Sequence, residues 1–263
     1  MDATLDHATI LAKLGTQFVG RNLEIHSELD STNTRATIWA KAGCPDGSVV
    51  VAEWQTAGRG RLGRQWYAPP YSSLLMSLVL RPELAVTQAP RVTMLCSLAV
   101  VEAIAKKVGL SAQIKWPNDI QLAGKKVAGM LTELGQEQGR LTHIVVGIGL
   151  NVNLDVSLLP PLAVPATSLA FEAGHHVSRT ELLVAILQAV EMRYLKLHEG
   201  WYPHEEWRAH LATLGQTVSI RDGKRHVSGI AIDVDPDGAL LVRCSGGHVE
   251  RILVGDVTLR DTD

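Results

Sequence analysis

The chain has 263 residues, of which 46% are hydrophobic and 20% charged, and its formal net charge at pH 7 is −2. This length and apolar content can bury a full hydrophobic core, and we expect one large domain and one small one. The nearly balanced charge excludes a global electrostatic field that would favour nucleic acid or an anionic membrane surface.

Cysteine and histidine usage bounds the chemistry further. Cys44, Cys96 and Cys244 are far apart and form no CxxC pair, which is typical of reduced thiols in a cytoplasmic protein. The ten histidines include the pair His175-His176 but no HExxH or other metal-binding spacing. We therefore expect no metal site.

The sequence carries no targeting signal of the usual kind. The N-terminus lacks the basic and apolar regions of a signal peptide. The longest apolar segment, Val92 to Ala105, is too short to cross a bilayer and contains Glu102. With Pro90 near its first turn and Gly109 just past its end, the segment is predicted to be a buried helix.

The first elements along the chain are two short helices and a strand. One helix is expected from about Ala8 to Gly15, and another follows Asp30-Ser31-Thr32-Asn33 and ends near Gly43. Capping alone would explain these four residues. Their side chains beside exposed N–H groups can also bind the polar head of a ligand. The run Ser48–Ala52 then predicts a strand.

The segment Gln55–Trp66 is the most informative in the sequence, because three glycines alternate with three arginines and a tryptophan follows. Glycine lets the backbone approach a ligand and expose consecutive N–H groups to an anion. Arginine supplies a planar, permanently charged fork that matches carboxylate and phosphate oxygens. We interpret the segment as a loop that holds an acyl phosphate or a nucleotide phosphate.

Other readings of this arginine loop fit less well. Gly58-x-Gly60-x-x-Gly63 spells a dinucleotide-binding fingerprint, but Trp66–Pro70 has no helical period and two prolines, so the required helix is missing. No Gly-Lys-Ser/Thr follows, which excludes a Walker A loop. A basic surface loop or an RNA contact stays open from this segment alone.

The middle of the chain alternates strands with one long helix. Strands are predicted at Ser72–Leu80 and Gln113–Trp116. A hairpin is predicted in which Asp119–Leu122 pairs with Lys126–Glu133 around Ala123-Gly124. The apolar run His143–Asn153 predicts a central strand, and its glycines Gly147 and Gly149 indicate that a ligand lies near it. Ser178-x-x-Glu181 is a capping-box pattern that opens a helix ending at Gly200.

The pattern of predicted secondary structure changes after Gly215. Short β runs separated by tight turns predict a small barrel, and we place the boundary near Leu214, giving domains of residues 1–214 and 215–263. The runs are Thr217–Arg221, Val227–Val234, Ala239–Val242 and Val249–Val254.

Two further sequence segments complete a set of motifs that can be compared with known families. Lys115-Trp116-Pro117-Asn118-Asp119 combines a cation, an indole and a polar turn, and Lys125-Lys126-Val127-Ala128-Gly129 puts two lysines at the start of a strand. Each alone is explained as a solvated turn or a basic strand end. Together with Asp30–Asn33, the arginine loop and Gly147-Ile148-Gly149-Leu150-Asn151, in this order, the sequence resembles the biotin–protein ligases from about residue 20 onward.

The resemblance implies an α+β fold: a mixed β-sheet with helices on one side, joined to a C-terminal SH3-like barrel. It implies that ATP activates biotin to biotinyl-5′-AMP, releasing pyrophosphate, and that biotin is then transferred to a lysine of a biotin carboxyl carrier protein. ATP and biotin are the implied substrates, with Mg²⁺ arriving on ATP. Free edges of the catalytic sheet could also pair two subunits into a homodimer.

The resemblance also implies roles for individual residues. Lys126 and Arg61 are the expected catalytic residues. The expected biotin-binding residues are Ser31, Thr32, Asn33, Gln55, Gly58, Arg59, Gly60, Arg61, Lys126 and Gly129. The expected ATP- and adenylate-binding residues are Arg59, Arg61, Arg64, Trp66, Lys115, Asn118, Lys126 and Asn151.

The sequence departs from the family pattern in two places, and two other functions have to be considered. About 20 residues precede the resemblance, too few for the winged helix-turn-helix of some members, so no specific DNA partner is expected. Asp155–Pro165 lacks the tryptophan of the family's ligand-ordering loop, so its adenylate contacts do not carry over. A lipoate–protein ligase would show Arg-Arg…Gly-Gly-Gly and His-Asp elements, which are absent. A nucleic-acid-binding module would need a second basic cluster, which is also absent.

Overall fold

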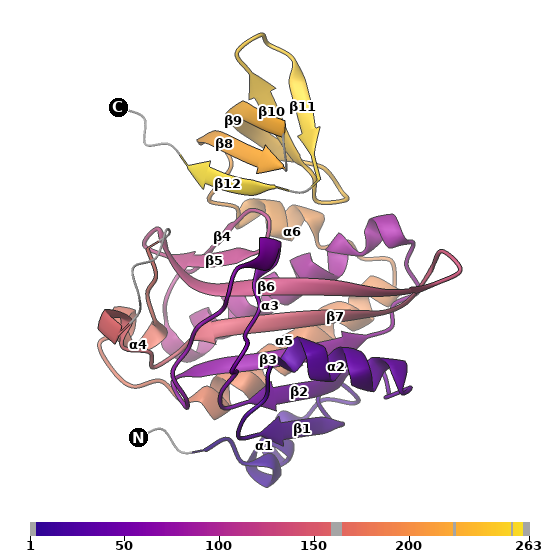
Figure 1. The fold of residues 1–263 in the computed structure, drawn as a ribbon, viewed down its shortest axis with the longest axis vertical. Coiled ribbons are helices and arrows are strands. Elements are labelled where there is room, and N and C mark those ends of the chain that lie inside the picture. Colours follow the sequence, from indigo (N-terminus) through magenta and orange to yellow (C-terminus); the bar gives the residue numbers. More distant parts are fainter. Residues whose placement is uncertain (1–3, 159–164, 223–224, 254, 260–263) are drawn as a thin grey trace.

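The computed structural model describes residues 4–158, 165–222, 225–253 and 255–259, and these form two β-sheets (Figure 1). The larger sheet has seven strands in the order β1-β2-β3-β7-β6-β5-β4. Only its β1–β2 pair is parallel, so the sheet is mixed. Its strands are β1 (Leu23–His26), β2 (Ser48–Ala52), β3 (Ser73–Leu80), β4 (Gln113–Lys115), β5 (Asp119–Leu122), β6 (Lys125–Glu137) and β7 (Arg140–Asn151).

Helices cover both faces of this sheet. The helices are α1 (His7–Leu14), α2 (Thr32–Lys41), α3 (Pro90–Val108), α4 (Leu169–Ala173), α5 (Arg179–His198) and α6 (His204–Ala209), with short 3₁₀ turns at Arg61–Gly63, Val86–Gln88 and Val156–Leu158. Met76 and Leu78 of β3 belong to the main core with α3 and α5, whereas Val79 packs in a smaller core with Ala36 of α2. Because successive side chains of a strand point to opposite faces, α2 lies opposite α3 and α5 (Figure 1). The expectation of helices on one side is therefore wrong.

The long apolar segment is a core helix, as predicted. α3 is buried along most of its length, begins with Pro90, and ends at Gly109, whose φ of 77° is left-handed. The stretch Val86–Val108 is long and apolar enough to cross a membrane by composition, yet 72% of its most apolar window is buried inside the fold. Packing against α5 and the large sheet accounts for this apolar surface.

The second sheet is antiparallel and lies at one end of the molecule (Figure 1). Its five strands run in the order β11-β10-β9-β8-β12, and they are β8 (Thr217–Asp222), β9 (Arg225–Val234), β10 (Leu240–Cys244), β11 (Val249–Ile252) and β12 (Asp256–Leu259). The buried indole of Trp116 joins the two sheets, because its Nε1 donates to the Gly238 carbonyl at 2.8 Å. The domain boundary near Leu214 stays a prediction.

Most of the predicted elements are present, with a few differences. β2 and β5 have the predicted bounds, whereas β6 (predicted Lys126–Glu133) and β7 (predicted His143–Asn153) start earlier than predicted and pair in a hairpin that the sequence reading did not predict. The sequence reading did not identify β1, α4, α6 or β12. At α5, Ser178 accepts from the Glu181 N–H as predicted, but the Glu181 carboxylate pairs with Lys13 and Lys107 instead of completing a capping box.

Candidate active site

A cavity of about 250 Å³ opens on the α2 face of the large sheet. The arginine loop, the start of α2, and the strands β6 and β7 all contribute to its wall. Nearly all the residues predicted to bind ligand line it: Ser31, Thr32, Asn33, Gln55, Arg59, Gly60, Arg61, Arg64, Trp66, Lys115, Asn118, Lys126, Gly129 and Asn151. The structure thus brings together segments that are more than a hundred residues apart in the sequence.

Gly58 is the one predicted site residue that does not line the cavity. Its carbonyl accepts the Trp66 N–H at 2.9 Å, which ties together the two ends of the arginine loop. A Cβ at this position would lie 2.4 Å from the Trp66 carbonyl oxygen. Gly58 therefore serves the close approach of two backbone segments.

One end of the cavity is a network of neutral hydrogen bonds. Gln55 Oε1 accepts from the Thr32 backbone N–H at 2.7 Å and lies 3.1 Å from its hydroxyl. The buried hydroxyl of Ser77 on β3 lies 2.8 Å from Thr32 Oγ1 and 2.7 Å from Asn33 Oδ1. Ser31 occupies the N-cap position of α2, but its side chain makes no capping hydrogen bond. Helix capping therefore does not explain the presence of this serine, and its side chain lines the cavity, where it can contact a ligand.

Glycines on the sheet make room for this network and for the tryptophan. A Cβ on Gly147 would lie 2.1 Å from Asn33 Oδ1, and a Cβ on Gly149 would lie 2.5 Å from the Trp66 ring. Gly129, which pairs with Gly149 across β6 and β7, has the Lys126 and Trp66 side chains over it. These three glycines explain how polar and aromatic side chains lie flat on a buried sheet.

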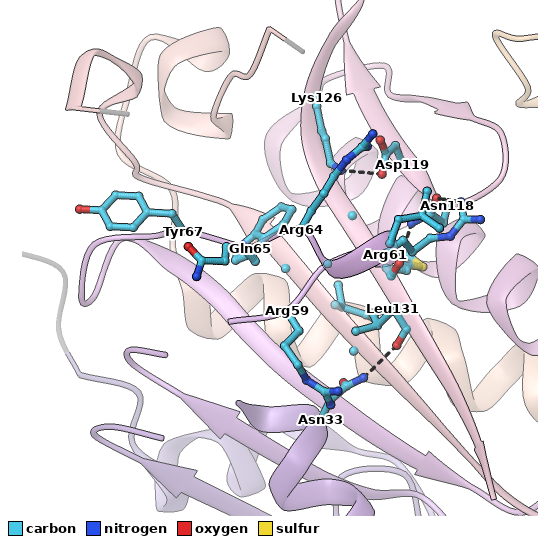
Figure 2. A pocket seen from close by; sticks show the side chains of 18 of the residues that line it. Asn33, Arg59, Arg61, Arg64, Gln65, Tyr67, Asn118, Asp119, Lys126 and Leu131 are labelled. Atoms are coloured by element: carbon cyan, nitrogen blue, oxygen red, sulfur yellow. Dashed lines mark hydrogen bonds and ion pairs between the residues drawn. The ribbon is translucent and has the colours of Figure 1, made fainter. Parts of the chain in front are cut away.

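Cations line the rest of the cavity, and one of them, Arg59, lies beside Asn33 (Figure 2), because Glu133 Oε2 accepts from both side chains. Arg59 Nη2 lies 2.9 Å from Glu133 Oε2, and Lys126 Nζ lies 2.7 Å from Asp119 Oδ1. Arg61 Nη1 donates to Asn118 Oδ1 at 3.0 Å. Arg64 and Lys115 also line this part of the wall. Five positive charges around one cavity can stabilise a phosphate-bearing ligand.

Lys126 is fixed by its backbone as well as by its side chain. Its N–H donates to Pro165 O and its carbonyl accepts from Thr167, both at 2.9 Å. The ammonium also lies 5.5 Å from the Trp66 ring centroid. Lys125 does not line the cavity; its ammonium is 3.8 Å from Glu172 and faces the Phe171 ring.

Among the described residues, two polar atoms of the cavity wall have no hydrogen-bond partner. Trp66 Nε1 and Asn151 Oδ1 are buried without a hydrogen bond, although Asn151 Nδ2 donates to Thr167 O at 3.0 Å. A buried polar group without a partner costs free energy. These atoms would be satisfied by a ligand that carries both donors and acceptors.

Sequence reasoning missed two residues that support the site. Ser77 and Glu133 hold the side chains of Asn33 and Arg59. Ser77 is a buried polar residue within the otherwise apolar run Leu74–Leu80. That exception to an apolar pattern was the available signal, whereas Glu133 resembles an ordinary solvated strand residue.

Uncharged hydrogen-bonding groups beside a group of cations suit a ligand that combines a neutral polar part with a phosphate. Residues 26–151 match the biotin/lipoate A/B protein ligase family, and residues 213–260 match the biotin protein ligase C-terminal domain. The latter match fits the SH3-like domain expected at this end of the chain.

Individual proteins support the same assignment. The chain is 35% identical to the bifunctional ligase/repressor BirA of Bacillus subtilis, over 97% of this chain and 79% of that protein. It is also 35% identical to the biotin–[acetyl-CoA-carboxylase] ligase of Paracoccus denitrificans, over 83% of this chain and 93% of that protein. A structure of Aquifex aeolicus biotin protein ligase in complex with biotin and ATP shares 30% identity and a TM-score of 0.77, covering 92% of this chain and all of the other. The chain therefore belongs to the biotin–protein ligase family, and its α+β fold is confirmed.

Proposed function

We propose that this chain is an ATP-dependent biotin–protein ligase whose two half-reactions take place in the cavity. In the first, the biotin carboxylate attacks the α-phosphate of ATP, which forms biotinyl-5′-AMP and releases pyrophosphate. In the second, a lysine amine of a carrier domain attacks the mixed anhydride, which forms an amide and releases AMP. The observation that carries this proposal is that uncharged hydrogen-bonding groups and five cations line one continuous cavity.

The neutral end is suited to the head of biotin. Ser31, Thr32, Asn33 and Gln55 offer hydroxyl and amide groups at one end of the cavity, and their mutual hydrogen bonds fix their orientation before a ligand arrives. A neutral cyclic urea both donates and accepts hydrogen bonds. Side chains with the same two capabilities match it, and the nearby Arg59 guanidinium is paired with Glu133.

The cationic end is suited to the adenylate and pyrophosphate. Lys126 lies beside Gly129 and Trp66, where a ligand can approach the sheet closely. We assign it to bridge the biotin carboxylate and the α-phosphate, because its charge gains value as negative charge develops in the displacement. Arg59, Arg61, Arg64 and Lys115 would surround the remaining phosphate oxygens, and Trp66 with Asn151 would border the nucleoside.

Mg²⁺ would arrive with ATP and neutralise phosphate charge. The carboxylates of Asp119 and Glu133 are already 2.7 and 2.9 Å from Lys126 and Arg59. We therefore propose that phosphate oxygens and water hold most of its coordination sphere. The residues described here fit an ion carried by its substrate better than a dedicated protein site.

The acceptor we propose is the biotin carboxyl carrier protein, a cytoplasmic partner, with no specific DNA and no membrane involved. A homodimer could form through β1 or β4, which are the two edges of the large sheet. Lipoate is the alternative acid, and the family relatives named above do not favour it.

The test is ATP–pyrophosphate exchange with biotin, with lipoate, and without an acid. We expect exchange when biotin is present, and none with lipoate or without an acid. Addition of a purified carrier domain should then yield one biotin on its acceptor lysine, measured by mass spectrometry. Exchange that is supported by lipoate and not by biotin would overturn the proposal.

A further inference from the structure

A second group of ligand-type side chains lies on the C-terminal sheet, in the hairpin of β10 and β11. The Cys244 sulfur, a ring nitrogen of His248 and a carboxylate oxygen of Glu250 all lie within 4.8 Å of one another. None of the three lines the active-site cavity. Their spacing, Cys-x3-His-x-Glu, is not one of the familiar metal motifs.

Backbone hydrogen bonds of the hairpin bring these residues together. The Cys244 N–H donates to the His248 carbonyl at 2.9 Å, and the Gly247 N–H donates to the Cys244 carbonyl at 2.9 Å. Gly247 has a φ of 81°, which is the left-handed conformation that such a turn requires. Cys244 and His248 are thus fixed opposite each other by the fold, so a ligand need not order them.

The strand register adds the third residue. Glu250 pairs with Val242, which is two residues before Cys244 on β10. Since side chains two residues apart on a strand share a face, Cys244, His248 and Glu250 project from one face of the hairpin. The His248 ring and the Glu250 carboxylate already approach to 3.5 Å.

Accessibility and chemistry suit a metal ion. Cys244 is a free, half-buried thiol, and the His248 side chain is 62% exposed. An incoming ion can therefore reach the site, with water completing the coordination. A thiolate, an imidazole and a carboxylate together favour a borderline-soft transition metal over Mg²⁺ or Ca²⁺.

We propose that Cys244, His248 and Glu250 form a site for one Zn²⁺-type divalent ion, with a water molecule as the fourth ligand. Binding deprotonates the thiol: the S–H bond breaks, a Zn–S bond forms, and the proton passes to solvent. Affinity consequently rises with pH. Such an ion would link β10 to β11 and stabilise the small sheet by binding only its folded form.

The experiment uses Co²⁺ as a spectroscopic substitute for Zn²⁺ on the full-length protein after treatment with a chelator. We expect a sulfur-to-cobalt charge-transfer band that saturates at one Co²⁺ per chain and disappears when Zn²⁺ is added. Cys244→Ser should abolish this band, and His248→Gln should weaken Co²⁺ binding at least about tenfold. Cys44 and Cys96 are buried, so they should not contribute.

His226→Gln provides a matched control, because His226 is another exposed histidine of the same sheet, in contact with Ser219. This variant should bind Co²⁺ like the wild type. Thermal unfolding with and without Zn²⁺ gives a second readout: the Tm should rise in the wild type and in His226→Gln but not in His248→Gln. The absence of a charge-transfer band in folded wild-type protein, or its persistence in Cys244→Ser, would overturn the proposal.

Discussion

The two ends of the active-site cavity are built differently. At the neutral end, Thr32, Asn33, Gln55 and Ser77 bond to one another through uncharged groups and are held over glycines of the sheet. At the cationic end, Lys126 contacts the Asp119 carboxylate and Arg61 the Asn118 amide, while Arg59 and Asn33 share the Glu133 carboxylate between the two ends. A ligand entering the first end finds an existing arrangement, whereas an anion entering the second must replace or reorient ion pairs.

The arginine loop adds to this contrast. Its tip residue Leu62 has a left-handed φ of 57° and a side chain that is 66% exposed. A bulky residue in this conformation is uncommon and strained, and Leu62 belongs to neither hydrophobic core of the described residues. From this difference we propose that biotin would be recognised by groups that are already oriented, whereas the nucleotide would be recognised only after charged side chains rearrange.

The largest expected effect is at Lys126. Lys126→Ala should slow adenylate formation about a hundredfold, since a charge-assisted contact made in the transition state contributes about 3 kcal/mol. Pyrophosphate exchange measures this step, and carrier labelling from pre-made biotinyl-adenylate measures the second, which should change much less.

Lys125→Ala is the matched control for Lys126. Lys125 is the adjacent lysine, but it lies beside Glu172 and Phe171 outside the cavity. Its removal should leave exchange close to the wild-type rate. If Lys125→Ala proves more damaging, or if Lys126→Ala forms adenylate normally, the assignment of the catalytic lysine is wrong.

The next effect tests preorganisation at the neutral end. Gly147→Ala would put a Cβ 2.1 Å from Asn33 Oδ1, and overpacking of this kind costs about 1–3 kcal/mol. Because the displaced side chain belongs to the proposed biotin pocket, we expect the KM for biotin to rise about tenfold or more and the KM for ATP to change little. Steady-state exchange assays measure both constants.

A double variant separates the clash from a general loss of stability. In Gly147→Ala with Asn33→Ala, the clash is removed, so the two substitutions should be clearly non-additive in biotin affinity. Additive effects would mean that the alanine acts elsewhere on the sheet. Such a result would remove the evidence that Asn33 is held in a preformed geometry.

A smaller effect is expected in the arginine loop. Arg61→Gly should leave the fold intact but let the adenylate escape about fivefold faster, the equivalent of about 1 kcal/mol for one partly exposed charged contact. The measurement is biotin labelling of bystander lysines on an added unrelated protein. Arg140→Ala, which removes an exposed arginine outside the cavity, should not label bystanders, and wild-type fidelity in Arg61→Gly would show that Arg61 does not retain the intermediate.

The sequence predicted the residues that line the cavity better than the residues that hold them in position. Arginines, lysines and Ser31–Asn33 carry chemistry that is readable from residue type and order, and they do line one cavity. The expectation of helices on one side of the sheet came from the family resemblance; the helix at α2 was itself predicted, but a sequence pattern does not say which face of a sheet a helix covers. Residues 159–164 of the predicted ligand-ordering segment lie outside the described part of the chain.

Contacts created by register were beyond sequence reasoning. Glu133 reaches Arg59 and Asn33 only because β6 pairs with β7 in one particular alignment. The cluster of Cys244 and His248 likewise depends on a hairpin turn, and its spacing matches no motif that a scan would test. Side chains that meet across strands are specified by pairing, which short-range patterns do not encode.

The smallest effect concerns the pH dependence of the sheet that carries the preformed end. Burial, followed by the charges of Arg81 and Lys41, lowers the pKa of His143 on β7 below its ordinary value of 6.5. Above that pH the imidazole is neutral in both the folded and unfolded chains, so it adds no pH dependence. As the pH falls below about 6.5, the unfolded chain binds the proton more readily, and the free energy of unfolding decreases until the folded pKa is reached. Urea unfolding from pH 8 to pH 5 should therefore show a smaller acid loss in His143→Gln than in the wild type, because all other groups titrate in both proteins. Parallel stability curves for the two proteins would assign the acid sensitivity of this sheet to other groups.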